Sequence, residues 1–137
     1  MSKRQPKQLN KYESELKLAI ETMMTKHEVN FSAFIDVLRN DLPEDKTSND
    51  YKVKYRAEYI KLLRASFTVN EVKNMLMVLG YNLVFFNDKT EIFAVPKILQ
   101  DTRIKYIDLM AVCELLRITI EWQKVSIEGT KNTKGNS

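Results

Sequence analysis

The 137-residue chain has little of the residue types from which common catalytic and metal sites are built. It contains one cysteine and one histidine. With Cys113 alone, neither an intrachain disulfide nor a cysteine-based metal cluster can form. With His27 alone, a zinc site made of several histidines is excluded as well. We expect Cys113 to be a buried apolar residue rather than a reactive thiol, and His27 to end a helix rather than to catalyse a reaction.

Glycine is also scarce, with three in the chain, two of them within the last nine residues. A glycine-rich phosphate-binding loop is therefore absent. Two local carboxylate pairs could be considered for magnesium, Asp36 with Asp41 and Glu44 with Asp45, but neither follows a metal-loop pattern. We therefore predict a protein that is not an enzyme and has no cofactor.

No apolar run approaches the roughly 18 residues that a membrane-spanning helix needs, and the charged start lacks a signal-peptide core. We expect an intracellular protein with no membrane contact. The formal net charge is +4, yet six of the 22 basic residues lie near the two ends of the chain. Without those six, 16 basic residues face 18 acidic ones, so the remainder is slightly acidic. The six are Lys3, Arg4, Lys7, Lys11, Lys131 and Lys134. We interpret residues 1–11 and 129–137 as disordered tails around a single domain at 12–128.

Apolar periodicity predicts four helices in the first part of the chain. Before the second helix, Asn30 is a suitable N-cap, with Val29 and Phe34 as a hydrophobic staple. Before the fourth, Thr68 and Glu71 form a capping-box pattern, and Gly80 follows its end. The four predicted helices span residues 13–27, 31–40, 50–65 and 69–79.

After Gly80 the period changes to that of strands. YNLVFF and TEIFAV flank an Asn-Asp-Lys turn and predict a β-hairpin, residues 104–116 predict a helix, and the alternation that begins at Arg117 predicts a third strand. The predicted fold class is thus α+β, with an N-terminal four-helix, helix-turn-helix-like bundle followed by a hairpin, a helix and a strand. The segments from Val72 and Leu109 onward also match each other at an offset of 37, through either a duplication or coincidence of apolar patterns.

The tract from Lys46 to Arg64, which contains most of the third predicted helix, carries a local charge of +4. The helix has two apolar stripes. One stripe contains Val53, Ala57, Ile60 and either Leu63 or Arg64, and the other contains Tyr51, Tyr55, Tyr59 and Leu62. Lys52 and Arg56 share a helix face flanked by Tyr51 and Tyr55, which could contact phosphates and base edges. The alternative is a solvated helix with an ion pair between Lys54 and Glu58.

The order of these helices resembles the helix-turn-helix domains of phage-type repressors. The resemblance covers residues 13–84, and FTVNEVKNMLMVLGYNL is similar to the segment after the recognition helix. It implies that the third helix enters the major groove of DNA, with six residues facing the duplex. These are Ser48, Asn49, Tyr51, Lys52, Tyr55 and Arg56. The basic tract adds Lys61 and Arg64 to the predicted nucleic-acid-binding residues.

Two hypotheses follow for the function. In the first, the protein is a small transcriptional regulator that binds double-stranded DNA through the third helix and forms a homodimer through its strands. The strands are rich in large apolar residues that could pair, namely Phe85, Phe86, Ile92, Phe93 and Trp122. In the second, the protein is an inhibitor or adaptor that contacts a protein partner through the tyrosine stripe or the hairpin edge.

Overall fold

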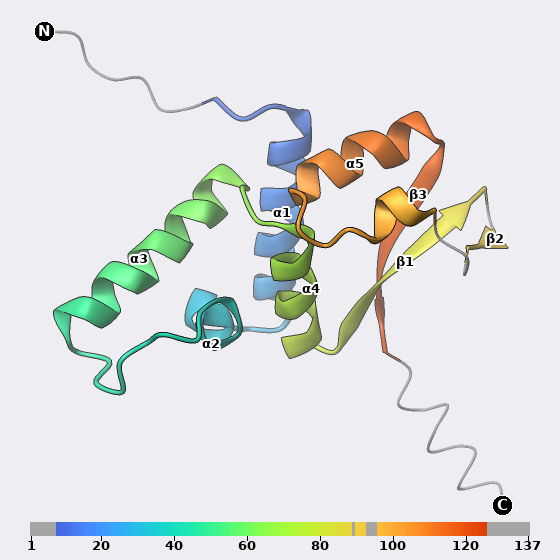
Figure 1. Cartoon of the computed structure of the whole chain (residues 1–137). Coiled ribbons are helices and arrows are strands. Elements are labelled where there is room, and N and C mark those ends of the chain that lie inside the picture. The colour runs from blue at the N-terminus through green and yellow to red at the C-terminus, as the bar shows by residue number, and fades with distance from the viewer. Residues whose placement is uncertain (1–7, 89, 93–95, 126–137) are drawn as a thin grey trace, which may run out of the picture.

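The computed structural model describes residues 8–88, 90–92 and 96–125, without the side chain of Ile98. In this part of the chain, helices surround one side of a three-stranded antiparallel sheet, so the predicted α+β class is confirmed. Figure 1 shows α3 projecting from the body on one side and the sheet on the other. Of the predicted tails, 1–11 and 129–137, residues 1–7 and 129–137 lie outside the described residues. None of the described helices has the length and hydropathy that crossing a membrane requires.

The first helix, α1 (Lys11–Lys26), begins two residues before its predicted start. Asn10 and Glu13 form a reciprocal capping box, in which each side chain accepts a hydrogen bond from the other's backbone. Lys11, which the prediction places in the N-terminal tail, is the first residue of this helix. His27 is the C-cap, as expected, and its Nε2 lies 3.1 Å from the hydroxyl of Tyr81.

The second helix differs from the prediction of one α-helix over 31–40. A 3₁₀ turn, η1 (Phe31–Phe34), leads into a single α-turn, α2 (Ile35–Leu38). Asn30 caps the backbone N–H of Ser32, and Phe31 and Phe34, both buried three residues apart, fit the three-residue repeat of a 3₁₀ turn. The backbone of Arg39 is extended, which ends the helix one turn after it becomes α-helical.

The next two helices follow the prediction closely. Ser48 caps α3 (Asn49–Arg64), which ends at Ala65 in a left-handed conformation with φ 53°. Thr68 and Glu71 form the predicted capping box of α4 (Val69–Val78). Gly80, with φ 83°, then turns the chain into the sheet, because glycine adopts positive φ without steric cost.

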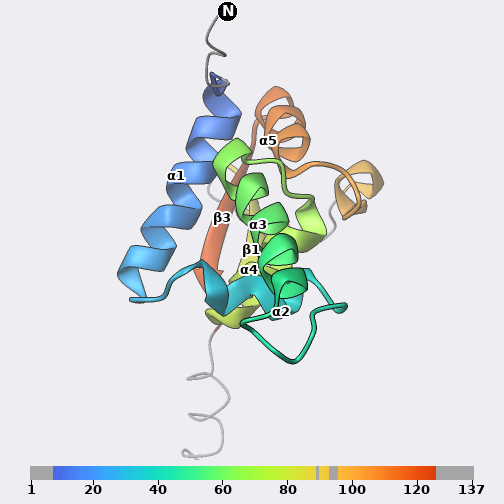
Figure 2. The same ribbon diagram turned by 90° about the vertical axis from the view of Figure 1, so that its left-hand side faces the viewer.

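The sheet has the strand order β2-β1-β3. The predicted hairpin forms from β1 (Tyr81–Asn87) and a short β2 (Thr90–Glu91), whereas Phe93 and the rest of the predicted second run lie outside the described residues. A 3₁₀ turn, η2 (Lys97–Gln100), leads to α5 (Tyr106–Leu115), and β3 (Ile118–Lys124) pairs antiparallel with β1. The third predicted strand is thus confirmed. Figure 2 shows β3 between α1 and β1.

The units α4-β1 and α5-β3 repeat each other at the offset of 37. Both helices contain ten residues, both strands contain seven, and every boundary of the second unit lies 37 positions after its counterpart. The turns also correspond, with Gly80 at φ 83° and Arg117 at φ 61°. Both segments therefore fold as a helix followed by a strand, as their sequence similarity predicts.

One core joins these elements, because α4 packs on β1, α5 packs on β3, and α1 contacts both α5 and α3. Phe31 occupies its centre and makes ring contacts with four other aromatic residues. The largest fully buried side chains are Phe31, Phe34, Phe67, Leu16, Ile35, Leu62, Leu109, Val72 and Cys113.

The buried position of Cys113 predicts an unreactive thiol in the native protein. The residue is 1% exposed, and burial raises the pKa of its thiol to about 11. At pH 8 the thiolate is then at least about 100-fold scarcer than in an unfolded chain. We expect labelling by a disulfide reagent at pH 8 to be slower by about this factor in native protein than in urea. Equal rates in the two conditions would show that α5 does not pack as described.

Candidate binding surface on helix α3

The tyrosine stripe of α3 faces the body of the protein. The ring of Phe31 makes edge contacts with Tyr55 and Tyr59, at centroid distances of 5.7 and 5.6 Å. Tyr51, Tyr55 and Tyr59 stack in a row, each 6.4 Å from the next. Burial, reinforced by the neighbouring Tyr59 and Tyr51, raises the pKa of Tyr55 above its ordinary value. This side of α3 is thus packed through the half-buried Tyr51 and Tyr55, whereas Tyr59 remains 39% exposed.

A buried carboxylate fastens the same side of α3. The side chain of Glu58 is 3% exposed and accepts a hydrogen bond of 3.0 Å from Arg39 Nη1. Lys61 Nζ lies 3.1 Å from Glu58 Oε1 and 2.9 Å from Glu71 Oε2. The contact of Lys61 with Oε1 is an ion pair without the angle of a hydrogen bond. Glu58 thereby links α3 to the end of α2, and Lys61 links α3 to α4.

Lys61 is consequently held on the inner side of α3 rather than available to a partner. Burial by itself lowers the pKa of Lys61, but the carboxylates of Glu71 and Glu58 outweigh this effect and raise it overall. The expected alternative pair of Lys54 with Glu58 is wrong. Lys54 instead binds Asp50 at 3.2 Å and Asp41 at 3.5 Å.

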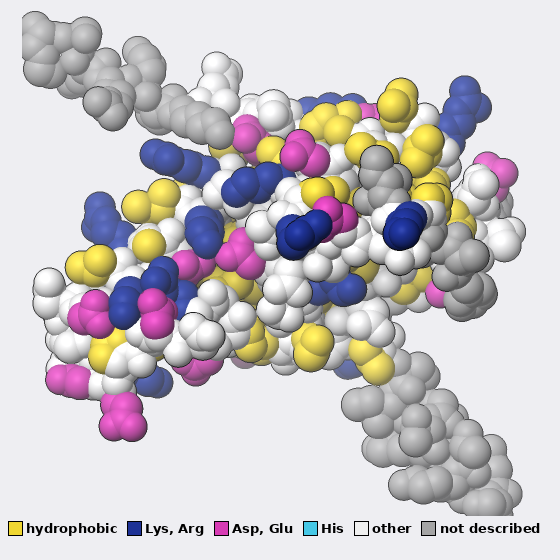
Figure 3. Space-filling view, viewed as in Figure 1, with side chains coloured by type: hydrophobic (Ala, Val, Ile, Leu, Met, Phe, Trp, Pro, Cys, Tyr) yellow, Lys and Arg dark blue, Asp and Glu magenta, His cyan; other side chains and the backbone are white. Residues whose placement is uncertain are grey.

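The opposite side of α3 is open to solvent, and we call it the outer face. It includes Val53 at 57% exposure and Leu63 at 44%. Three cations on it, Lys52, Arg56 and Arg64, have no carboxylate within 4 Å in the described part of the chain. Figure 3 shows basic, apolar and acidic side chains intermixed in the region of α3. The outer face consists of Asn49, Lys52, Val53, Arg56, Ala57, Ile60, Leu63 and Arg64.

The eight residues predicted to bind nucleic acid thus divide between the two sides of α3. Ser48 caps the helix by accepting a hydrogen bond from the backbone of Tyr51. Asn49, Lys52, Arg56 and Arg64 are exposed on the outer face. Tyr51, Tyr55 and Lys61 lie on the inner side. The structure brings together half of the predicted set.

The predicted set omits the exposed apolar residues of the outer face, Val53, Ile60 and Leu63. The two apolar stripes of this helix were the sequence signal for an exposed apolar face. A helix on the surface of a domain normally buries only one stripe, so the other is left in solvent. Which stripe is buried depends on Phe31, which comes from a different part of the chain.

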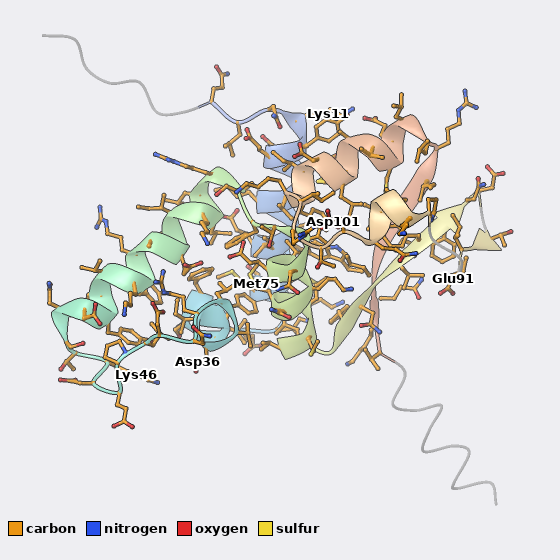
Figure 4. The ribbon with its side chains drawn as sticks, in the orientation of Figure 1. Lys11, Asp36, Lys46, Met75, Glu91 and Asp101 are labelled. Carbon is orange, nitrogen blue, oxygen red and sulfur yellow. The ribbon has the colours of Figure 1, made fainter. Side chains whose placement is uncertain are left out.

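Two of the four carboxylates considered for magnesium, Asp41 and Asp45, have other contacts. Asp41 accepts two hydrogen bonds from Arg39, and Asp45 accepts hydrogen bonds from the backbone and hydroxyl of Thr47. Asp36 is exposed on α2, and Lys46 lies on the loop before α3, both labelled in Figure 4. Among the described residues, no three His, Cys, Asp or Glu side chains are grouped so that they could hold a metal ion.

Comparison of the chain with protein-family models, with curated proteins and with solved structures gives no match. Its function is therefore inferred from the arrangement of its own side chains.

Removal of the Glu58 carboxylate tests whether it fastens α3. Because Glu58 is buried between two cations, we expect Glu58→Ala to lower the free energy of unfolding by about 2–3 kcal/mol. The matched control is Glu15→Ala on α1, an exposed position where the change should be within about 0.5 kcal/mol. Urea denaturation of both variants measures the difference. Equal stability of the two variants would contradict the role given to Glu58.

The ion pair between Arg39 and Asp41 predicts that the stability of the folded protein decreases at acidic pH. Hydrogen bonding to Arg39 holds the pKa of Asp41 well below its ordinary value. A lowered pKa in the folded state stabilises the protein fully above about pH 4, where the carboxyl group is ionised in the unfolded chain too, and this stabilisation is lost as the pH falls further. Asp41→Asn should therefore be less stable than wild type at pH 6, and the difference should shrink toward pH 2.5. Urea denaturation at several pH values tests this, and a constant difference would contradict it.

Proposed function

We propose that the protein is a non-enzymatic binding module that docks an acidic, partly apolar protein surface on the outer face of α3. The observation that carries the proposal is the combination, on one face, of exposed apolar residues with three cations that lack a carboxylate partner in the described structure. Interfaces between proteins are built around apolar and arginine-rich centres, which this face supplies.

The charge of the outer face favours an acidic partner. α3 contains two acidic residues. Glu58 is buried, and the exposed Asp50 pairs with Lys54, so neither forms an ion pair with Lys52, Arg56 or Arg64. Lys52 and Arg64 are twelve positions apart, which corresponds to about 18 Å along the helix. A helix or strand with carboxylates spaced over this length would complement all three cations.

The apolar residues between those cations favour a protein over a nucleic acid. Val53, Ile60 and Leu63 gain free energy only if a partner covers them, and a row of phosphates does not. Tyr55 packs against Phe31, and Tyr51 stacks on Tyr55. This points the same way, because these tyrosines were expected to contact the bases. The slightly acidic charge of the chain without its ends also disfavours a polyanion.

Double-stranded DNA is the second candidate. It is favoured by the projection of α3 from the body, visible in Figure 1, and by Asn49, Lys52 and Arg56 on its outward side. This is the arrangement that the resemblance to repressors implies, in which a protruding helix enters the major groove. A homodimer through the strands would then place two copies of α3 on one duplex.

One titration separates the two candidates. The probes are a helical peptide of leucines and glutamates with leucines at positions i, i+3, i+4 and i+7, and a random-sequence DNA duplex, both followed by fluorescence anisotropy. We expect the peptide to bind the wild-type protein. The combined variant Lys52→Glu, Arg56→Glu should lower its affinity about tenfold or more. The matched control is Lys73→Glu with Lys124→Glu, which changes the net charge equally at exposed positions outside α3 and should have a smaller effect.

Leu63→Ser tests the contribution of apolar contacts to peptide binding. Its control is Leu115→Ser, which removes an even more exposed leucine from α5. Only Leu63→Ser should weaken binding of the peptide. This effect should persist at high salt because the lost contact is not electrostatic. Duplex binding that is tighter than peptide binding and is lost in the α3 double variant would instead establish the DNA function. Equal effects of the α3 variants and their controls would refute both candidates.

A further inference from the structure

The strand β3 has one free edge. In the order β2-β1-β3 it pairs with β1 on one side only. Val125 donates its backbone N–H to Gly80 at 2.7 Å, so odd-numbered residues of this strand bond to β1 and even-numbered ones face away. The outward backbone groups belong to Ile118, Ile120 and Trp122. In the described part of the chain, none of these groups has a hydrogen-bond partner.

An open cleft of about 620 Å³ lies along this edge, between α1, α5 and β3. Its walls combine apolar residues with the charged side chains of Lys11, Glu15, Glu114 and Arg117. An occupant would be held by backbone hydrogen bonds on one side and by apolar contact on the other. The apolar residues that line it are Leu16, Ala19, Met110, Ile118, Ile120 and Trp122.

The other helix–strand unit shows how such a strand edge is paired. At the corresponding edge of β1, the chain supplies its own antiparallel strand, β2, and Ile92 donates its N–H to Phe85 at 2.7 Å. Phe85 corresponds to Trp122 at the offset of 37 residues. The edge of β3 therefore presents backbone groups in the same arrangement, without a strand beside them in the described structure.

Contacts between α1 and α5 close one end of the cleft. Lys11 Nζ binds Glu114 at 2.9 Å, and the hydroxyl of Tyr12 donates to the same carboxylate. Figure 4 places Lys11 at the end of α1 next to α5. A chain that runs antiparallel to β3 reaches this closed end with its carboxyl terminus.

An unpaired cation lies at the closed end. Arg117 lines the cleft and has no carboxylate within 4 Å in the part of the chain that the structure describes, because Glu114 is engaged by Lys11. Arg117 also has φ 61°, a left-handed conformation that arginine adopts at a cost, whereas its counterpart Gly80 adopts it freely. The unpaired guanidinium of Arg117 can bind a carboxylate through two parallel hydrogen bonds.

We propose that the cleft binds the extended, apolar carboxyl-terminal segment of a partner protein. The segment adds to β3 as an antiparallel strand and directs alternate side chains into the apolar cleft. Its terminal carboxylate meets the guanidinium of Arg117. This site is separate from the outer face of α3 and does not depend on the function proposed for it.

The test uses the peptide acetyl-Thr-Val-Thr-Val-Thr-Val with either a free carboxylate or a carboxamide at its end. Trp122, the only tryptophan in the chain, lines the cleft and reports binding by its fluorescence. We expect the free acid to bind at least about tenfold more tightly than the amide. The Arg117→Gly variant should bind the free acid only as tightly as the wild-type protein binds the amide. The control Arg103→Gln, which changes an exposed arginine outside the cleft, should leave binding of the acid unchanged.

Thermal unfolding of Arg117→Gly separates recognition from folding, because glycine suits the positive φ and the variant should be at least as stable as wild type. N-methylation of alternate peptide residues tests the hydrogen bonds. Methyl groups on the set that faces β3 should abolish binding, and those on the other set should not. Equal affinity for acid and amide, or equal effects of the two methylation patterns, would overturn the proposal. Sedimentation that shows a dimer with Trp122 covered by a second copy would overturn it too.

Discussion

The packing of Phe31 against Tyr55 and Tyr59 determines which side of α3 faces the body. Both tyrosines meet the ring of Phe31 edge-on, and Leu62 is buried on the same side of the helix. Glu58 strengthens this choice, because a carboxylate that is 3% exposed needs the cations of Arg39 and Lys61 beside it. With Leu62 buried and Tyr51 and Tyr55 half-buried on this side, the other apolar stripe of α3 is left in solvent. The basic and apolar outer face is thus a consequence of the core.

The second half of the chain shows a related constraint. Two helix–strand units of equal length pair their strands antiparallel, so Leu83 lies opposite Trp122 and Phe85 opposite Ile120. The hairpin covers part of the outer edge of β1, whereas α1 stands away from the edge of β3 and leaves a cleft. The two proposed sites therefore arise from different causes, an unburied stripe on a helix and an unpaired edge on a sheet.

Much of the fold could be predicted because its signals are local. The capping box of Thr68 and Glu71, the turn at Gly80 and the alternation after Arg117 each depend on a few neighbouring residues. The second helix could not be predicted correctly, because its short length depends on Arg39 leaving the helix to bind Asp41 and the distant Glu58. The site was predicted only in part for the same reason. The sequence contains both stripes of α3, but the choice between them is made by a phenylalanine from another element.

The orientation of α3 is the central claim, and solvent relaxation of methyl groups by a dissolved gadolinium chelate measures it most directly. Val53 and Leu63, at 57% and 44% exposure, should be strongly relaxed, whereas Leu62, at 2%, should be protected to the level of Leu109 in the core. Leu115, at 81% exposure, is the reference for a fully accessible methyl group. Protection of Val53 and Leu63 equal to that of Leu62 would show that the outer face is covered, and would contradict the account.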